Sequence, residues 1–389
     1  MATKITNYQC PACMGPLHFK SDSGKLECDY CGSIFTVSEI ETMYAQQNTQ
    51  AAQAAQAADA SQTTQTVEEE WTPEGEWDVS EAGGDWGADA GSLRVYNCPS
   101  CGAELLCEET TAATSCPYCG NPSIIPGQLS GSKKPDYIIP FRLDKNAAIA
   151  ALKDHYRGKP FLPKQFSREN HLEEIKGVYV PFWLFDARAD GDITFHATRV
   201  HTRRAGDYEE TITDHFRVRR AGSAEFRRIP VDGSSQMPDD HMDSIEPFDY
   251  GELQPFSLSY LPGYLADKYD VTAEESEARA DERCSASIRD ILRSDVHGYA
   301  TVTPGKADVI LQRGQVKYAL LPVWMLNTRW QDRNYLFAMN GQTGKLVGDL
   351  PVSKGKFWGA LAGITALGTV LFHFLGVGSF VWSLLSEFL

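Results

Sequence analysis

Eight cysteines stand in four Cys-x-x-Cys pairs, a spacing that can bring several thiolates onto one metal ion. The loop between the pairs has the same length in both halves, which indicates an internal duplication. Four thiolates spaced in this way predict a closed tetrahedral site, and Zn²⁺ is the commonest structural ion in such sites. We therefore predict two structural zinc sites of four cysteines each, with iron as the alternative ion for the same ligands. The predicted ligands are Cys10, Cys13, Cys28 and Cys31 in the first site, and Cys98, Cys101, Cys116 and Cys119 in the second.

Redox and disulfide chemistry are weaker interpretations of these cysteines. A thioredoxin-like dithiol lies at a strand-to-helix junction, whereas these pairs lie in hairpin-like stretches. A disulfide framework needs an oxidising compartment, and the opening "MATKITNYQ" has no apolar core for export. Gly32, Gly102 and Gly120 directly follow three of the pairs, where a tight turn needs a positive φ, but Met14 follows the first pair.

The chain of 389 residues is long enough for two or three structural units. We expect a first zinc ribbon over 1–40, a disordered linker over 41–94 and a second ribbon over 95–130. The formal net charge is −16, and there is no Lys or Arg from Leu26 to Leu93. Polyanions should be repelled from that stretch.

The predicted linker has two parts. Residues 45–66 are rich in Ala, Gln and Thr and offer no apolar face to bury. Residues 68–91 place Trp71, Trp77 and Trp86 among acids and glycines. A solvated acidic spacer is one interpretation of this segment, and a short partner-docking motif is the other, because indoles are enriched at binding hot spots.

Residues 135–352 are expected to form an α+β domain that is mostly antiparallel β. Asp144 predicts the start of a helix that Gly158 and Pro160 end. Thr272 and Glu275 form a capping-box pattern at the start of a second helix. Its apolar stripe is predicted to contain Ala280, Cys284, Ile288 and Ile291, so Cys284 is interpreted as a core residue. Cys107 is likewise interpreted as a small apolar filler rather than a fifth ligand.

Two stretches of this domain, 191–204 and 207–220, alternate with the period of two that strands require, and "AGD" joins them as a turn. They predict an antiparallel meander that carries the most basic surface of the chain. That surface could bind nucleic acid, anionic lipid or an acidic segment, or it could be a solvated face balanced by Glu209, Glu210 and Asp214. Its arginines are Arg199, Arg203, Arg204, Arg217, Arg219, Arg220, Arg227 and Arg228.

A weaker repeat relates "GVYVPFWLF" at 177–185 to "YALLPVWML" at 318–326, with "YIIPF" at 137–141 as a shorter copy. Proline removes a ladder donor, so these strands are predicted to lie at edges or to carry bulges. Trp183 and Trp324 are interpreted as core anchors. The second copy leads into a predicted hairpin with Asn340-Gly341 or Thr343-Gly344 at its turn.

No catalytic motif is found, because the histidines are scattered and no phosphate loop, nucleophile elbow or dinucleotide fingerprint occurs. We therefore predict that the protein is not an enzyme and takes no small-molecule substrate. Residues 237–247 cluster Asp239, Asp240, His241, Asp243 and Glu246. A hard cation could bind there, but a solvated acidic loop is the commoner outcome.

The end of the chain has no formal charge between Lys356 and Glu387, and 357–383 is predicted to be one transmembrane helix. Trp358 and Trp382 would lie roughly 36 Å apart along it, near the two interfaces of a bilayer. Lys354 and Lys356 at its start place the ribbons and the β domain in the cytoplasm, on a single-pass protein anchored through its C-terminus in the inner membrane. Gly359 and Gly363 could let two spans approach, and a re-entrant turn at Gly376 and Gly378 is a minor alternative.

Four stretches resemble a family of bacterial membrane proteins with N-terminal zinc ribbons, and they cover most of residues 135–355. The stretches are "IIPFRLDKNAAIAAL", "GVYVPFWLFDA", "IPVDGSSQMPDDHMDSIEPFDYGELQPFSLSYLPGYLADKYDV" and "LLPVWMLNTRWQDRNYLFAMNGQTGKLVGDLPVSK". Members are labelled TFIIB-type zinc-ribbon proteins, and some relatives occur in envelope-stress gene clusters with phage-shock protein A homologues and SPFH-type membrane-scaffold proteins. The resemblance implies that such proteins are partners.

Three functions are weighed on this basis. The favoured one is a non-enzymatic, membrane-tethered adaptor that presents its zinc ribbons to protein partners. A zinc-ribbon nucleic-acid-binding protein is the alternative, although the ribbons lack a basic, aromatic face. An enzyme of unknown type is the third, and it lacks a recognisable nucleophile or base.

Overall fold

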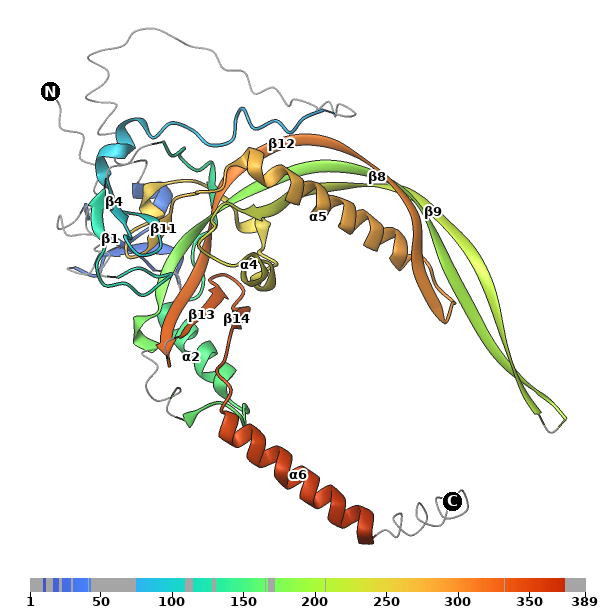
Figure 1. Cartoon of the computed structure of the whole chain (residues 1–389). Helices are drawn as coiled ribbons and strands as arrows, with labels where there is room; N and C mark the ends of the chain where they lie inside the picture. The colour runs from blue at the N-terminus through green and yellow to red at the C-terminus, as the bar shows by residue number, and fades with distance from the viewer. Residues whose placement is uncertain are drawn as a thin grey trace.

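The computed structural model describes the chain in twelve ranges and is drawn in Figure 1. Cys13, Met14, Trp71, Trp382, residues 43–74 and the end of the predicted span from 375 lie outside them. The described residues are 10–11, 17–20, 23–28, 31–40, 42, 75–108, 115–127, 131–164, 166, 172–206, 208–331 and 333–374.

The first ribbon forms its own three-stranded sheet, in the order β1-β2-β3. Its strands are β1 (Leu17–Lys20), β2 (Lys25–Cys28) and β3 (Ile34–Phe35). A capping box follows β3, because the amide of Thr36 donates to Glu39 and the amide of Glu39 donates to the Thr36 hydroxyl. Leu26 and Ile40 belong to the same hydrophobic cluster as residues of the main domain, so the first ribbon is continuous with the larger core.

The remaining strands of the described residues form one sheet of eleven, so the protein is mostly β, as the sequence predicts. The main path runs β10-β7-β12-β8-β11-β5-β4-β6; β9 pairs with β8, β13 with β12, and β14 with β13. The strands are β4 (Leu93–Asn97), β5 (Glu104–Glu108), β6 (Ile125–Gly127), β7 (Tyr137–Ile138), β8 (Lys176–Ala205), β9 (Tyr208–Asp232), β10 (Gln254–Pro255), β11 (Leu265–Asp267), β12 (Thr301–Trp330), β13 (Arg333–Asn340) and β14 (Leu346–Gly348).

The second ribbon is part of this sheet rather than a separate unit. Its strand β5 pairs with β11, where Leu106 lies opposite Ala266, and β11 pairs in turn with β8. Cys98 and Leu105 are buried in the same cluster as Val178 and Phe182 of β8. The second ribbon, predicted over 95–130, is thus joined to the large sheet, because one of its edges is completed by a strand 160 positions away that no local pattern could indicate.

Three long strands, β8, β9 and β12, curve together into an arch that extends from the body of the molecule (Figure 1). The predicted hairpin between β8 and β9 is confirmed, with Ala205 opposite Tyr208 at its tip. The strands are much longer than predicted, because β8 continues through Gly191 instead of beginning there. A Cβ at Gly191 would lie 2.9 Å from Leu292, so this glycine allows the close approach of a helix rather than a turn.

The two proline-containing repeats pair with each other at the centre of the sheet. Val180 lies opposite Leu321, and each precedes the proline of its own copy. Of the two predicted alternatives, the strands do not lie at edges but do carry bulges, although none falls at Pro181 or Pro322. Pro181 instead lies where β8 exchanges β11 for β9 as its neighbour, and Pro322 lies where β12 exchanges β7 for β13. Each proline stands where no ladder donor is needed, and its carbonyl accepts from a glycine, Gly233 or Gly341.

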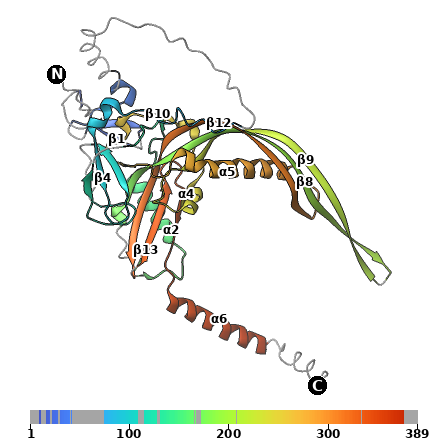
Figure 2. The same cartoon turned by 45° about the horizontal axis from the view of Figure 1, so that its top comes forward.

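The helices cover parts of this sheet (Figures 1 and 2). The two predicted N-caps are confirmed: Asp144 accepts from the amide of Ala147, and Thr272 forms a capping box with Glu275. The predicted hairpin of β13 and β14 is also confirmed. The helices are α2 (Lys145–Tyr156), α4 (Asp239–Ile245), α5 (Ala273–Ser294) and α6 (Lys354–Phe374), with 3₁₀ turns η1 (Gly87–Ser92), η2 (Leu172–Glu174), η3 (Tyr250–Glu252) and η4 (Leu258–Tyr260).

Helix α5 packs its apolar stripe against the concave side of the arch. Ala280, Cys284 and Ile288 are buried as predicted, and Leu292 continues the stripe against Ile193 and Phe195 of β8. Ile291 is 45% exposed, so its predicted place in the stripe is wrong. Successive steps of four residues from Ala280 lead to Leu292, and the step of three to Ile291 turns off that face.

Part of the predicted linker is built into the domain. The segment from Gly75 to Ser92, called the strap, crosses from α5 to the second ribbon with Trp77 and Trp86 both buried. The amide of Asp78 donates to the carbonyl of Gly314, and its carbonyl accepts from Val316, at a bulge of β12. The interpretation of residues 75–94 as a disordered spacer is therefore wrong. Two buried indoles and the backbone hydrogen bonds to β12 fix this segment in place.

Helix α6 projects from the body, on the side away from β4 (Figures 1 and 2). Its stretch Lys354–Phe372 is long and apolar enough to cross a membrane. The side chains of Trp358, Ile364 and Leu367 are each at least 64% exposed, unlike those of a core helix. The described part of the chain thus carries one candidate span at the predicted place.

Candidate metal centres

The four cysteines of the second predicted site are brought together by the structure. Their sulfur atoms all lie within 4.8 Å of one another. The Sγ atoms of Cys98 and Cys119 are 3.5 Å apart, and those of Cys101 and Cys116 are 3.6 Å apart. A tetrahedral ion at about 2.3 Å from each sulfur holds the sulfurs about 3.8 Å apart. The spacing of these sulfurs therefore fits one metal ion held by four thiolates.

Backbone geometry explains how each knuckle turns its two thiols to one side. Gly102 donates its amide to the carbonyl of Cys98, and Gly120 donates to the carbonyl of Cys116. Gly32 makes the same bond to Cys28 in the first ribbon. All three glycines have φ between +70° and +82°, which confirms the predicted reason for their positions.

The thiols of the second cluster differ in their tendency to ionise. Burial opposes the ionisation of Cys98, but hydrogen bonds from the amides of Cys101 and Ser100 outweigh it and lower its pKa to about 7. Burial raises the pKa of Cys101 to about 11 and raises that of Cys116 beyond the usual range. Buried thiols that do not ionise readily alone are stabilised as thiolates by a bound cation.

Three side chains of the β domain hold the second knuckle of this cluster. Lys176, at the start of β8, donates to the carbonyl of Ser115 at 2.5 Å. The amide group of Asn327 on β12 donates to the carbonyl of Tyr118. The hydroxyl of Tyr118 donates to Asp267 of β11 at 2.5 Å. Sequence reasoning missed these residues, because they come from three strands and no spacing signal links them to the cysteines.

Lys176 also supplies positive charge beside the cluster. Burial lowers the pKa of Lys176, and the negative charges of the neighbouring Cys116 and Glu174 partly oppose this shift. Four thiolates around a divalent ion carry a net charge of −2, so an ammonium group nearby offsets charge that burial makes costly.

Three of the four cysteines of the first predicted site lie together in the structure. Sulfur atoms of Cys10, Cys28 and Cys31 lie within 4.8 Å of one another, and the fourth predicted ligand, Cys13, lies outside the described residues. The Sγ atoms of Cys10 and Cys31 are 3.5 Å apart. Cys10 and Cys28 are fully buried, but Cys31 is exposed and donates to the hydroxyl of Ser33. The donor set again suits a metal that prefers thiolate, and the choice between zinc and iron is left open by the ligand type.

The two remaining cysteines lie outside both clusters. Cys107 and Cys284 are both fully buried among apolar side chains, as predicted. Burial raises the pKa of Cys284 to about 12. Among the described residues, neither cysteine belongs to a group that could hold a metal.

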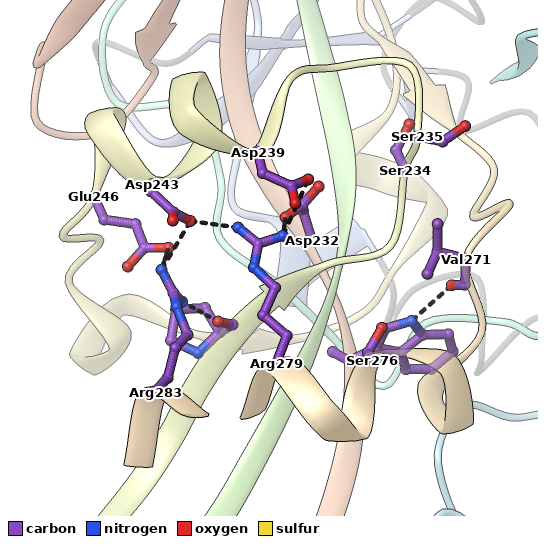
Figure 3. A network of polar contacts seen from close by, with 12 residues as sticks. Asp232, Ser234, Ser235, Asp239, Asp243, Glu246, Val271, Ser276, Arg279 and Arg283 are labelled. Carbon is purple, nitrogen blue, oxygen red and sulfur yellow. Dashed lines mark hydrogen bonds and ion pairs between the residues drawn. The ribbon is translucent and has the colours of Figure 1, made fainter. Parts of the chain in front are cut away.

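Three acids of the cluster at 237–247 belong to an ion-pair network (Figure 3), and in the described part of the chain this cluster is not among the groups that could hold a metal ion. Arg279 of α5 contacts Asp232, Asp239 and Asp243, each at 3.1 Å or less. Arg283 contacts Asp243 and Glu246. Burial raises the pKa of Asp232 and of Glu246, and the adjacent guanidinium groups oppose that rise. Asp239, Asp240 and Asp243 are exposed, as the interpretation of a solvated acidic segment expects, but the segment is helical and α5 presents two arginines to its carboxylates.

Three arginines of the arginine-rich hairpin pair with acids of the same two strands. Arg203 pairs with Glu210 at 2.7 Å, and Arg227 pairs with Glu225 at the same distance. Arg219 forms two hydrogen bonds with Asp192, one of them at 2.7 Å. These pairs favour the interpretation of a solvated sheet face over a polyanion-binding surface.

These features define a class of protein: mostly β, with two cysteine clusters that could hold metal ions and one C-terminal helix that could cross a membrane. The chain is 33% identical over 337 residues to the uncharacterized protein YdjG of Bacillus subtilis (strain 168). The match covers 73% of this chain and 99% of YdjG, so the chain belongs to the YdjG family. No family model and no solved structure matches it.

Proposed function

We propose that this protein is a membrane-tethered adaptor of the bacterial inner membrane, in which two zinc ribbons present a recognition surface to cytoplasmic protein partners. The observation that carries the proposal is the combination of two thiol clusters in the body with an apolar helix whose side chains are exposed. The body lies between the second ribbon and α6, so a membrane around α6 leaves the ribbon accessible (Figure 2). The resemblance to TFIIB-type zinc-ribbon proteins suggests phage-shock protein A-like or SPFH-type partners in envelope stress.

Zinc has a structural part in this proposal. Cys98, Cys101, Cys116 and Cys119 would hold one ion, and Cys10, Cys28 and Cys31 with Cys13 would hold the other. The bound ion supplies folding free energy to segments too short to bury a core of their own. Lys176 and Asn327 orient the second knuckle, and recognition is performed by the ribbon surface rather than by a reaction at the metal.

A nucleic-acid-binding function has less support. Three of the eight arginines of the hairpin are paired with acids, and the chain as a whole has a net charge of −16. Phosphate neutralisation supplies most non-specific affinity for nucleic acids. An absence of salt-dependent binding to DNA and RNA by the metal-loaded protein would remove this alternative.

The membrane part is tested by introducing charge into the middle of α6. Ile364→Asp combined with Leu367→Asp should release the protein from membranes into alkaline carbonate washes, because each acid near the bilayer centre costs about 3 kcal/mol. Tyr208→Asp is the matched control, since Tyr208 is 80% exposed at the tip of the arch and should leave the protein in the membrane. Equal retention of the double variant and the control would contradict a transmembrane α6.

The adaptor part is tested by affinity purification from detergent-solubilised membranes. Cys28→Ser and Cys116→Ser should each lose metal and the proteins that co-purify through the corresponding ribbon. Cys107→Ala is the matched control, because it removes a ribbon thiol that lies outside both clusters. A partner set that is unchanged when both clusters are disrupted would overturn the adaptor function.

A further inference from the structure

The loop after α2 lies against the first turn of α6, although almost two hundred residues separate them (Figure 1). The amide of Ser353 donates to the carbonyl of Phe161 at 2.8 Å. The ammonium of Lys356 donates to the carbonyl of Leu162 at 2.6 Å. The ring centroids of Phe161 and Phe357 are 5.9 Å apart. These contacts fix the loop beside the point where the candidate span begins.

The two segments in contact are basic. Residues 157–164 read "RGKPFLPK" and residues 353–358 read "SKGKFW", and together they contain no acidic side chain. We call these two segments the basic collar. Its cations are Arg157, Lys159, Lys164, Lys354 and Lys356, and all five residues are exposed. Arg157 is paired with Asp154 of α2 at 2.9 Å. The collar therefore concentrates positive charge around the base of α6 in a chain whose net charge is −16.

Aromatic side chains accompany these cations. Phe357 is 44% exposed and Trp358 is 64% exposed, and their rings meet edge to face. Aromatic rings and long basic side chains are the groups that occupy the interface between hydrocarbon and headgroups, where a ring is partly buried and an ammonium reaches the phosphates. The composition of the collar is thus that of a membrane interface, and half of it comes from a loop outside the span.

Charge complementarity indicates that anionic phospholipid headgroups bind the basic collar. Anionic phospholipids give the cytoplasmic face of a membrane a negative surface potential, which attracts basic groups and repels acidic ones. An acidic domain would be held away from such a surface except where its cations gather. The collar is continuous with α6, so the insertion of α6 places its lysines at headgroup depth.

We propose that the basic collar is a second membrane contact, which binds anionic phospholipid headgroups and fixes the orientation of the β domain on the bilayer. The loop 157–164 acts as a bracket: it contacts the lipid surface through Lys159 and Lys164 and contacts α6 through Phe161 and Leu162. This inference rests on the proposed membrane tether, because α6 must be in the bilayer for the collar to reach its surface.

The test is hydrogen exchange of the full-length, metal-loaded protein in lipid nanodiscs, with phosphatidylcholine alone or with phosphatidylglycerol added. Amides of residues 158–164 should exchange more slowly in the anionic discs, by roughly fivefold for each lysine that reaches the surface. Lys159→Gln combined with Lys164→Gln should abolish this lipid dependence. Lys133→Gln combined with Lys306→Gln is the control of equal charge change, because both lysines are exposed elsewhere in the fold, and it should keep the dependence.

The exchange experiment distinguishes a failure of the collar proposal from a failure of the membrane tether. A protein that integrates into the discs but exchanges equally in both lipids overturns the collar and leaves the membrane tether standing. Loss of the lipid dependence in both double variants also overturns the collar, since general charge would then explain the effect. A protein that does not integrate overturns the tether and the collar together.

Discussion

The indole N–H of Trp77 donates to Oδ1 of Asp281 at 3.1 Å, across 204 positions of the chain. The rings of Trp77 and Phe185 also pack edge to face, with their centroids 4.9 Å apart. Asp281 is held in place by Arg313 of β12, which donates to both of its carboxylate oxygens. One tryptophan thus joins the strap, α5 and the arch, and the acidic segment before the second ribbon is a structural part of the domain.

Trp77→Ala should lower the free energy of unfolding by about 3 kcal/mol or more, because it removes a large buried side chain and leaves a cavity. Trp77→Phe keeps the ring contact but not the donor, and Asp281 stays paired with Arg313. It should therefore cost only about 1 kcal/mol. Urea unfolding in detergent measures both losses. Equal stability of Trp77→Ala and the unchanged protein would mean that the strap is not coupled to the core.

Features encoded by a few adjacent residues could be predicted from the sequence. The caps at Asp144 and Thr272 are examples, because a side chain that accepts from an amide three residues later needs no distant partner. The glycines after the knuckles are another, since a positive φ is a local demand. Those signals placed both helices and the cysteine pairs.

Features that depend on distant partners could not be predicted. Pro181 and Pro322 mark exchanges of strand neighbours, and the identity of those neighbours is set by the whole sheet. Lys176 and Asn327 reach the second cysteine cluster from strands far along the chain, and the sequence around each residue carries no signal of a contact with cysteines. Tertiary pairing, rather than local propensity, decides such contacts.

Arg279 of α5 offers a test of buried charge. Its guanidinium contacts Asp232 at 2.6 Å, and the side chain of Asp232 is only 3% exposed. Arg279→Gln should cost about 3 kcal/mol or more, because it leaves a buried carboxylate without its counterion. Adding Asp232→Asn should restore part of the loss, whereas Arg203→Gln, on the exposed hairpin, should cost at most about 1 kcal/mol. Additive effects of the Arg279 and Asp232 substitutions in urea unfolding would contradict the pairing.

The raised pKa of Asp267 predicts that the free energy of unfolding depends on pH. Asp267 is fully buried, and burial raises its pKa to about 7, against about 3.9 in an unfolded chain. Between these values the native state binds more protons than the unfolded state, so this group's contribution is complete below about pH 4 and falls until about pH 7.

Asp267→Asn removes that titration, and its amide oxygen can still accept from Tyr118 and Ser234. The difference in unfolding free energy between Asp267→Asn and the unchanged protein should therefore shift in favour of the variant by a few kcal/mol from pH 5 to pH 8. Because both proteins contain the same cysteines, effects of pH on metal binding cancel in this difference. Parallel stability curves would show that Asp267 does not titrate in this range.

The two cysteine clusters should differ in how far the loss of metal spreads, because the first ribbon has its own sheet and the second shares one with the β domain. Each structural zinc contributes folding free energy on the order of 10 kcal/mol. Cys28→Ser should therefore remove one metal ion per chain and speed amide exchange in β1, β2 and β3. The large sheet should stay protected, because the first ribbon contacts it through apolar side chains and not through a strand ladder. Cys116→Ser should remove the other metal ion and speed exchange in β4 and β5 and also in β11, whose ladder with β5 would open. Cys107→Ala should keep both metals and normal exchange. Exchange that is confined to residues 93–127 in Cys116→Ser would contradict this coupling, because the sheet contact through Ala266 would then persist without the metal.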